Sequence, residues 1–221
     1  MLYGKKYKNH ELRSLLISRA YDDYVVARTQ HFEIVKDKLD EKTVLYVKGY
    51  GNDIELIKCF RELLFNSREQ LDYLLYCLNK KTSDLQVKIP RDFLAFSKRL
   101  MAGDFDSYDY ELLDFLKTNI TYIFHIRKVR NEIKSNISNI DFRFVTDHFE
   151  AAFWVPIKKD EFELVQYLDI ANKDKAIANE HYHCTFNLDV YFAEMVEFWN
   201  VALSLLDKTL VVEQTPPSEF S

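Results

Sequence analysis

Apolar residues recur every three or four positions over three long stretches of the chain, and this spacing predicts long helices. The stretches cover residues 10–41, about 53–81, and 108 to about 135. In the second stretch one apolar position repeats every seven residues, which is typical of helices packed nearly antiparallel in a bundle. The repeating residues are Ile57, Leu64, Leu71 and Leu78, with Phe60 and Leu74 in the second seam.

After Asn136 the apolar period shortens to two, which predicts strands with one buried face. The alternating segments are "DFRFV", "FEAAFWVPI" and "HYHCTFNLDV", with a short helical or irregular piece expected at about 159–179. A final helix is predicted over 191–210. The sequence therefore predicts a mainly α fold: an antiparallel helical bundle with a small antiparallel β insert before the last helix.

Turn-forming residues and poor helix formers mark the breaks between these segments. "TVLYVKGYGND" interrupts the pattern between the first two helices. "RDFLAFSKRLMAG" predicts a short helix closed by Gly103. Thr118 and Asn119 predict a bend in the third long helix, because both are poor helix formers.

The domain organisation is predicted from the lack of any flexible linker between these segments. We expect a single domain over residues 1–221, in which about 10–136 and 188–210 form the bundle and about 140–188 form the β-containing insert. The two prolines in "EQTPPSEFS" end the last helix, so the tail is expected to fray.

Composition supports long helices and argues against several classes of protein. The chain has 4 Gly and 4 Pro in 221 residues, few for a turn-rich β fold. A net charge of −5 disfavours a general nucleic-acid coat, so no DNA partner is expected, although a local basic groove stays open. The 3 cysteines form no disulfide framework, and we find no signal peptide or apolar run of about 18 residues. We therefore expect a cytoplasmic protein with no membrane partner.

The stretch "IRKVRNEIKSN", residues 126–136, places polar side chains on an apolar helix. With about 100° per residue, Arg130 lies about 40° from Ile126, at the edge of the apolar stripe. A guanidinium cannot stay unpaired against a core, so Arg130 must meet a carboxylate, a carbonyl, a ligand or solvent in a groove. Asn131 points elsewhere and shares its face with Ser135. Both a structural arginine paired with a buried acid and a binding site remain open.

A second candidate lies in "FNSREQLDYLLYCL" on the predicted second helix. Arg68 and Asp72 are four residues apart and can pair on one face. Asn66 and Tyr73 are seven residues apart and also share a face. The alternative interpretation of the charged pair is a surface ion pair, which contributes little to stability.

A third candidate is the pair His181 and His183, two residues apart on one face of a predicted strand. Both rings can approach one ion, but zinc would need a third and a fourth ligand, and solvent-facing histidines are the alternative. The sequence contains no Gly-rich phosphate loop, Walker motif, HExxH helix or serine elbow, and no cofactor is expected.

Two of these stretches together resemble the HEPN domains. "LFNSREQLDYLLYCL" is similar to the "hNLRsaLDhLvy" helix of that superfamily and "IRKVRNEIKSN" to its "lRNxxKH" helix end, with "VKIP" where its members have an extended segment. The resemblance covers roughly residues 10–136 and implies a helical bundle that is often dimeric and often cleaves RNA. In the first motif the matched residues are Asn66, Arg68, Leu71, Asp72, Tyr73 and Leu74.

The resemblance also implies where the chemistry would lie. In active HEPN ribonucleases an arginine with a polar neighbour precedes a nearby histidine, and two copies form one composite site across a dimer. Arg130 matches the arginine and Asn131 the polar neighbour, but Ser135 stands where the histidine is expected. A serine cannot move a proton near neutral pH as an imidazole does, so the family's catalysis is not expected here.

These observations lead to three hypotheses. The first is a non-catalytic HEPN-like binding module, with RNA or a protein as partner, acting in defence or stress response as a homodimer. The second is a divergent metal-independent endoribonuclease in which Asn131, Lys134 or Tyr73 replaces the histidine. The third is a metal-binding protein that uses His181 and His183. The candidate binding residues for the first are Arg130, Asn131, Lys134, Ser135, Asn66, Arg68, Asp72 and Tyr73.

Overall fold

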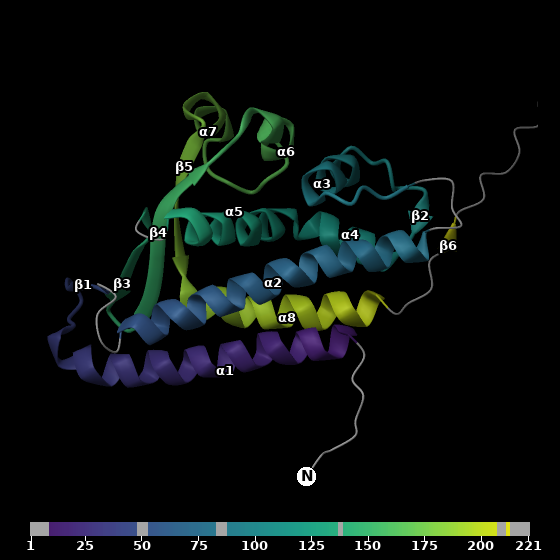
Figure 1. The fold of residues 1–221 in the computed structure, drawn as a ribbon. Coiled ribbons are helices and arrows are strands. Elements are labelled where there is room, and N and C mark those ends of the chain that lie inside the picture. Colours follow the sequence, from purple (N-terminus) through teal and green to yellow (C-terminus); the bar gives the residue numbers. More distant parts are fainter. Residues whose placement is uncertain (1–8, 48–52, 83–87, 137–138, 207–210, 213–221) are drawn as a thin grey trace, which may run out of the picture.

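Two long helices, α1 (Asn9–Val35) and α2 (Asp53–Lys81), lie side by side and run in opposite directions (Figure 1). α8 (Leu188–Leu206) packs against both, while α4 (Glu111–Thr118) and α5 (Ile120–Asn136) together occupy the remaining position of the bundle. The predicted mainly α class with a small antiparallel sheet is confirmed. The computed structural model describes residues 9–47, 53–82, 88–136, 139–206 and 211–212.

The seven-residue apolar repeat of α2 is buried, as its spacing predicts. Leu64, Leu71 and Leu78 are fully buried, and Ile57 packs half-buried against the same core. α2 contacts α1, α5 and α8, so it occupies the middle of the bundle.

α1 buries one side only. Ile17 and Tyr24 face the core, whereas Leu12 and Leu16 are exposed. The helix ends at Val35, before the predicted end at residue 41, and continues as the 3-10 helix η1 (Lys36–Lys38). The prediction was wrong here because residues 36–41 are charged except for Leu39, which packs against the core from an extended conformation.

Side-chain hydrogen bonds set the ends of the shorter helices. α3 (Phe93–Met101) begins after Asp92, whose Oδ2 accepts a hydrogen bond of 2.8 Å from the backbone amide three residues on, and Gly103 follows it with φ of 84°. Asn119 separates α4 from α5, and its Nδ2 donates to the carbonyl oxygen of Phe115 at 2.8 Å. The predicted short helix and the predicted bend are both confirmed.

The third long helix begins later than predicted. Its expected first residue, Tyr108, lies instead in the short strand β2 (Tyr108–Asp109), which pairs with β6 (Val211–Val212). Tyr110 follows in an extended conformation, and its buried hydroxyl donates to the carbonyl oxygen of Leu206 at 3.0 Å. This long-range hydrogen bond holds the backbone of Tyr110 extended, so helix α4 starts only at Glu111.

The sheet has the order β1-β3-β4-β5, with every pair antiparallel. β3 (Asp141–Val145), β4 (His148–Pro156) and β5 (His181–Asn187) are the three strands that the alternation predicts. β1 (Val44–Tyr46) lies between α1 and α2, where the sequence predicts only a break. The sequence signal was too weak to predict this strand, because β1 has only three alternating residues and its partner β3 is distant in the sequence.

One face of the sheet packs on the bundle, and Phe142, Phe144 and Phe149 fill the space between them. Between β4 and β5 the chain forms η3 (Lys159–Glu161), α6 (Phe162–Val165) and α7 (Lys173–Asn179), which confirms the expected short helical piece. Bundle and insert share one apolar core.

α8 begins at Leu188, earlier than predicted, because Asn187 caps it. The side-chain oxygen of Asn187 accepts hydrogen bonds from the amides of Asp189 and Val190 at 3.1 and 3.3 Å. Asp189 in turn accepts from the hydroxyl of Tyr24 at 2.7 Å and pairs with Arg28 at 3.0 Å. This network joins α8 to α1 where the sheet meets the bundle.

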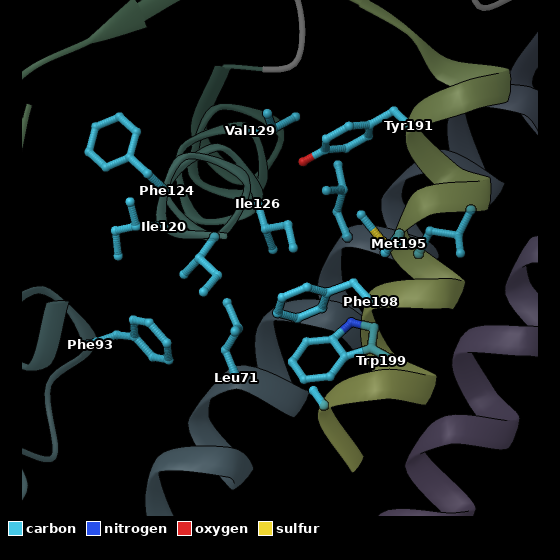
Figure 2. Close-up of a cluster of buried hydrophobic side chains, with 14 of the residues drawn as sticks. Leu71, Phe93, Ile120, Phe124, Ile126, Val129, Tyr191, Met195, Phe198 and Trp199 are labelled. Atoms are coloured by element: carbon cyan, nitrogen blue, oxygen red, sulfur yellow. The ribbon is translucent and has the colours of Figure 1, made fainter. Parts of the chain in front are cut away.

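Figure 2 shows the core between α5 and α8. Ile126 and Val129 of α5 lie opposite Met195 and Phe198 of α8, and all four are buried. Trp199 donates from Nε1 to the hydroxyl of a buried serine of α2, Ser67, at 3.2 Å. No helix among the described residues is long and apolar enough to cross a membrane.

Candidate functional site

One side of α2 carries polar and aromatic residues at helical spacing, next to α5. α5 runs antiparallel to α2 (Figure 1), and its Arg130 and Arg127 lie along this row, near Phe65 and Arg68. We call the combined surface the α2–α5 strip. It consists of Arg61, Phe65, Arg68 and Asp72 on α2 and Arg127, Arg130 and Lys134 on α5.

Arg130 stacks on an aromatic ring instead of pairing with an acid. Its guanidinium carbon lies 4.8 Å from the ring centre of Phe65, and that of Arg61 lies 5.8 Å from the same ring. Nη1 of Arg130 donates to the side-chain oxygen of Asn131 at 3.3 Å. Its Nε is buried without an acceptor among the described residues. Within these residues, the buried acid that a structural arginine would require is not found.

Arg127 lies one turn earlier on the same side of α5. Its Nε is also buried and has no acceptor within the described part of the chain. Burial lowers the pKa of this guanidinium below its ordinary value, and the nearby charge of Arg68 lowers it further. Sequence reasoning missed Arg127, although its spacing of three from Arg130 was a signal that both share one side.

The predicted pairing of Arg68 with Asp72 is confirmed: the two side chains form an ion pair. Asn66 and Tyr73 lie elsewhere, on the side of α2 that faces α1. Nδ2 of Asn66 donates to the carbonyl oxygen of Leu16 at 3.4 Å, and Arg13 lies over the Tyr73 ring at 5.3 Å. These two candidates therefore contribute to the α1–α2 contact and not to the strip.

The strip leads into a groove of about 820 Å³ beside the second half of α2. Tyr76 projects into solvent there with 63% of its surface exposed. We call this the Tyr76 groove. Its polar lining consists of Asp72, Tyr76, Asn79, Lys80, Thr82, Lys88 and Arg91.

The end of α5 is open to solvent. Asn131, Lys134 and Ser135 are all exposed. The histidine of this helix, His125, lies on the opposite side from Arg130, and its Nε2 is 2.8 Å from the hydroxyl oxygen of Tyr182. Burial lowers the pKa of His125 to about 4, so its imidazole is neutral near pH 7 and far from the strip.

His181 and His183 face solvent from β5, as the alternation predicts. Their rings contact the indole of Trp154 edge-on, with ring centres 4.9 and 5.2 Å apart. Over the described residues, no group of three or more His, Cys, Asp or Glu side chains could hold a metal ion. The metal-binding hypothesis therefore receives no support from the geometry.

Comparisons of the chain with protein-family models, with curated proteins and with solved structures found no match. The likeness to HEPN domains thus stays a prediction from two motifs.

Proposed function

We propose that this protein is a non-catalytic, HEPN-like module that binds RNA along the α2–α5 strip. The observation that carries the proposal is the state of Arg127 and Arg130. Each has a buried Nε without an acceptor, and neither forms an ion pair within the described residues. Holding such charges unpaired costs free energy, and a phosphate group bound at the accessible part of these half-buried side chains would offset that cost.

The strip and groove together favour a single-stranded chain of phosphates over a small anion. Cations follow the surface from Arg61 at one end to Arg91 at the other, although the whole protein carries a net charge of −5. Guanidinium groups suit phosphates because they bind them with two parallel hydrogen bonds. The exposed ring of Tyr76 can stack on an unpaired base, which duplex DNA does not offer.

The proposal is non-catalytic because the proton-transfer group is not in place. His125 is half-buried on the other side of α5, and Ser135 stands where the resemblance expects an imidazole. A role in defence or stress response, in the cytoplasm, belongs to this proposal through the HEPN resemblance alone.

Fluorescence anisotropy with a labelled single-stranded RNA of about 20 nucleotides tests the proposal. The variant Lys80→Ala/Lys88→Ala/Arg91→Ala should bind at least about tenfold more weakly and lower the log–log salt slope by about 2. The matched control Lys38→Ala/Lys42→Ala/Lys175→Ala removes the same charge from exposed positions elsewhere and should bind like the original chain. Equal losses in both variants, or no RNA binding at all, would refute the proposal.

The second candidate function is a divergent metal-independent endoribonuclease. The hydrogen bond of 3.3 Å between Arg130 and Asn131 favours it, because an arginine beside a polar residue is what the resemblance implies for the site. Incubating the labelled RNA with protein and EDTA, followed by gel analysis, decides between the two. Cleavage that Arg130→Gln and Asn131→Ala abolish would establish the enzyme, while intact RNA supports the binding module.

A further inference from the structure

The outer side of α1 exposes a row of large apolar side chains. Leu12, Leu15, Leu16 and Val26 are 49%, 49%, 48% and 55% exposed. In Figure 1, α1 lies at the margin of the bundle, with α2 and α8 on its inner side. Clustered exposed apolar residues of this kind mark an interaction surface.

Six positions on this side of α1, three of them apolar, have the spacing of a two-helix seam. These positions alternate in steps of four and three, which keeps them on one side of a helix and suits packing against a second helix. We call this set of positions the α1 seam. It consists of Leu12, Leu16, Arg19, Asp23, Val26 and Gln30.

The four central positions of the α1 seam are symmetric about the level of Tyr21 in apolar character and in charge, whereas the outermost pair sets Leu12 against Gln30. Leu16 and Val26 lie equally far from this midpoint, on either side of it. Arg19 and Asp23 lie equally far from it as well and carry opposite charges. At these four positions, an antiparallel copy of α1 related by a two-fold axis at the level of Tyr21 would set apolar side chains against apolar ones and positive charges against negative ones.

We infer that the α1 seam is a homodimer interface in which two α1 helices pack antiparallel. Leu16 then contacts Val26 of the second copy, and Arg19 meets Asp23 of the second copy. Within one chain Arg19 and Asp23 already pair at 3.0 Å, with side chains 74% and 43% exposed, so both can share their charges with a partner. A charged pair between the apolar positions of the seam fixes the register of the two helices.

This interface is separate from the α2–α5 strip, which it leaves open on both copies. It differs from the dimer that the HEPN resemblance implies, in which the two Arg130 motifs would meet. The α1 seam spans 19 residues, from Leu12 to Gln30, so it is about 28 Å long. An interface of that length lies at the small end for specific dimers, and the association is weak and reversible.

Sedimentation velocity of the full chain without RNA tests the inference independently of the proposed function. Over about 1 to 200 μM, the original chain should shift reversibly from monomer to dimer. Leu16→Glu and Val26→Glu should each stay monomeric over this range, because both place a carboxylate in the apolar part of the seam. An original chain that stays monomeric throughout would overturn the inference.

Charge exchange distinguishes this seam from any other contact. Arg19→Asp brings four carboxylates together at the axis and Asp23→Arg brings four guanidiniums together, so each variant alone should be monomeric. The double variant Arg19→Asp/Asp23→Arg restores alternating charges and should dimerise again. A mixture of the two single variants should form a heterodimer, because each supplies the sign that the other lacks.

The matched control is Lys58→Asp, which makes the same change of charge in an exposed ion pair with Glu55 on α2. It should dimerise like the original chain, and circular dichroism should show the same thermal unfolding for all variants because the changed positions are exposed. A dimer that persists in both single charge variants would place the contact elsewhere and overturn the inference.

Discussion

Helix α5 carries cations on two sides, and the two sides differ in how those charges are satisfied. Lys128 is buried and forms an ion pair with Glu161. The carboxylate of Glu161 also accepts a hydrogen bond of 2.9 Å from the backbone amide of Lys158. Arg127 and Arg130 lie half-buried on the strip with Nε groups that lack acceptors among the described residues.

On this one helix, the paired lysine stabilises the fold, whereas the arginines without ion pairs are suited to binding a ligand. The Lys128–Glu161 pair ties α5 to η3 and so fixes the β insert on the bundle. A buried pair of this kind is costly to break but leaves no charge for a ligand. Neither arginine forms an ion pair among the described residues, although the charges of Asp92, Glu161 and Asp72 act on Arg127 from a greater distance, so their positive charge is less fully satisfied than that of Lys128.

The largest expected effect comes from breaking the buried pair. Lys128→Met should destabilise the protein by about 3–5 kcal/mol in urea unfolding, because it leaves the Glu161 carboxylate buried without a cation. Lys128→Met/Glu161→Gln should lose less stability, since no unpaired charge remains and the glutamine oxygen can still accept a hydrogen bond from the Lys158 amide. A double variant less stable than Lys128→Met would show that the pair itself, and not the orphaned charge, matters.

The next effect concerns the neutral histidine on the architectural side of α5. Burial lowers the pKa of His125 to about 4, below the ordinary value of about 6.5. The fold therefore holds the neutral form, so this contribution is complete above about pH 6.5 and is lost as the pH falls towards 4. Urea unfolding should show about 3 kcal/mol of pH-dependent loss that His125→Leu removes. An unchanged pH profile in that variant would assign the loss to other groups.

A smaller loss is expected at the junction of α1 and α8. Asp189→Ala removes the acceptor of Tyr24 and the partner of Arg28, and should cost about 1–3 kcal/mol in the same unfolding assay. Asp23→Ala on the exposed side of α1 serves as the control. At protein concentrations too low for dimerisation, it should change the free energy of unfolding by less than about 0.5 kcal/mol. Equal losses of stability in Asp189→Ala and Asp23→Ala would show that the hydrogen bonds of Asp189 do not stabilise the junction.

The smallest effect on stability is expected on the strip itself. Arg127→Met should leave the free energy of unfolding within about 0.5 kcal/mol or raise it, because burial and Arg68 disfavour this charge more than the carboxylates of Asp92, Glu161 and Asp72 favour it. The same variant should weaken RNA binding in the anisotropy assay. A loss of stability as large as that of Lys128→Met would show that Arg127 is structural and would remove the contrast between the two sides.

The helical parts of the fold could be predicted because their signals are local. The repeat of α2, the cap at Asp92 and the break at Asn119 all lie within a few residues of the structure they determine. β1 could not be predicted this way, because it is a strand only through its pairing with β3. The extended conformation of Tyr108 was missed for the same reason, since it depends on β6.

The candidate site was predictable in part. Spacing correctly placed Arg68 beside Asp72 and Arg130 at the edge of the core. Spacing alone could not say which neighbouring helix each side of α2 would meet, so Asn66 and Tyr73 were assigned to the site although they face α1. Nor could it show which cations lack acceptors, which is what distinguishes Arg127 from Lys128.

The pairing of β1 with β3 also affects the order of folding. Val44 lies opposite Val145, so the chain must close a loop that contains α2, α3, α4 and α5 before these strands can meet. Closing so long a loop is entropically costly, whereas the helices form from local contacts. The edge of the sheet is therefore completed late, after the bundle that supports it. Because only three residues hold β1 in place, its amides should be among the first in the sheet to exchange with deuterium.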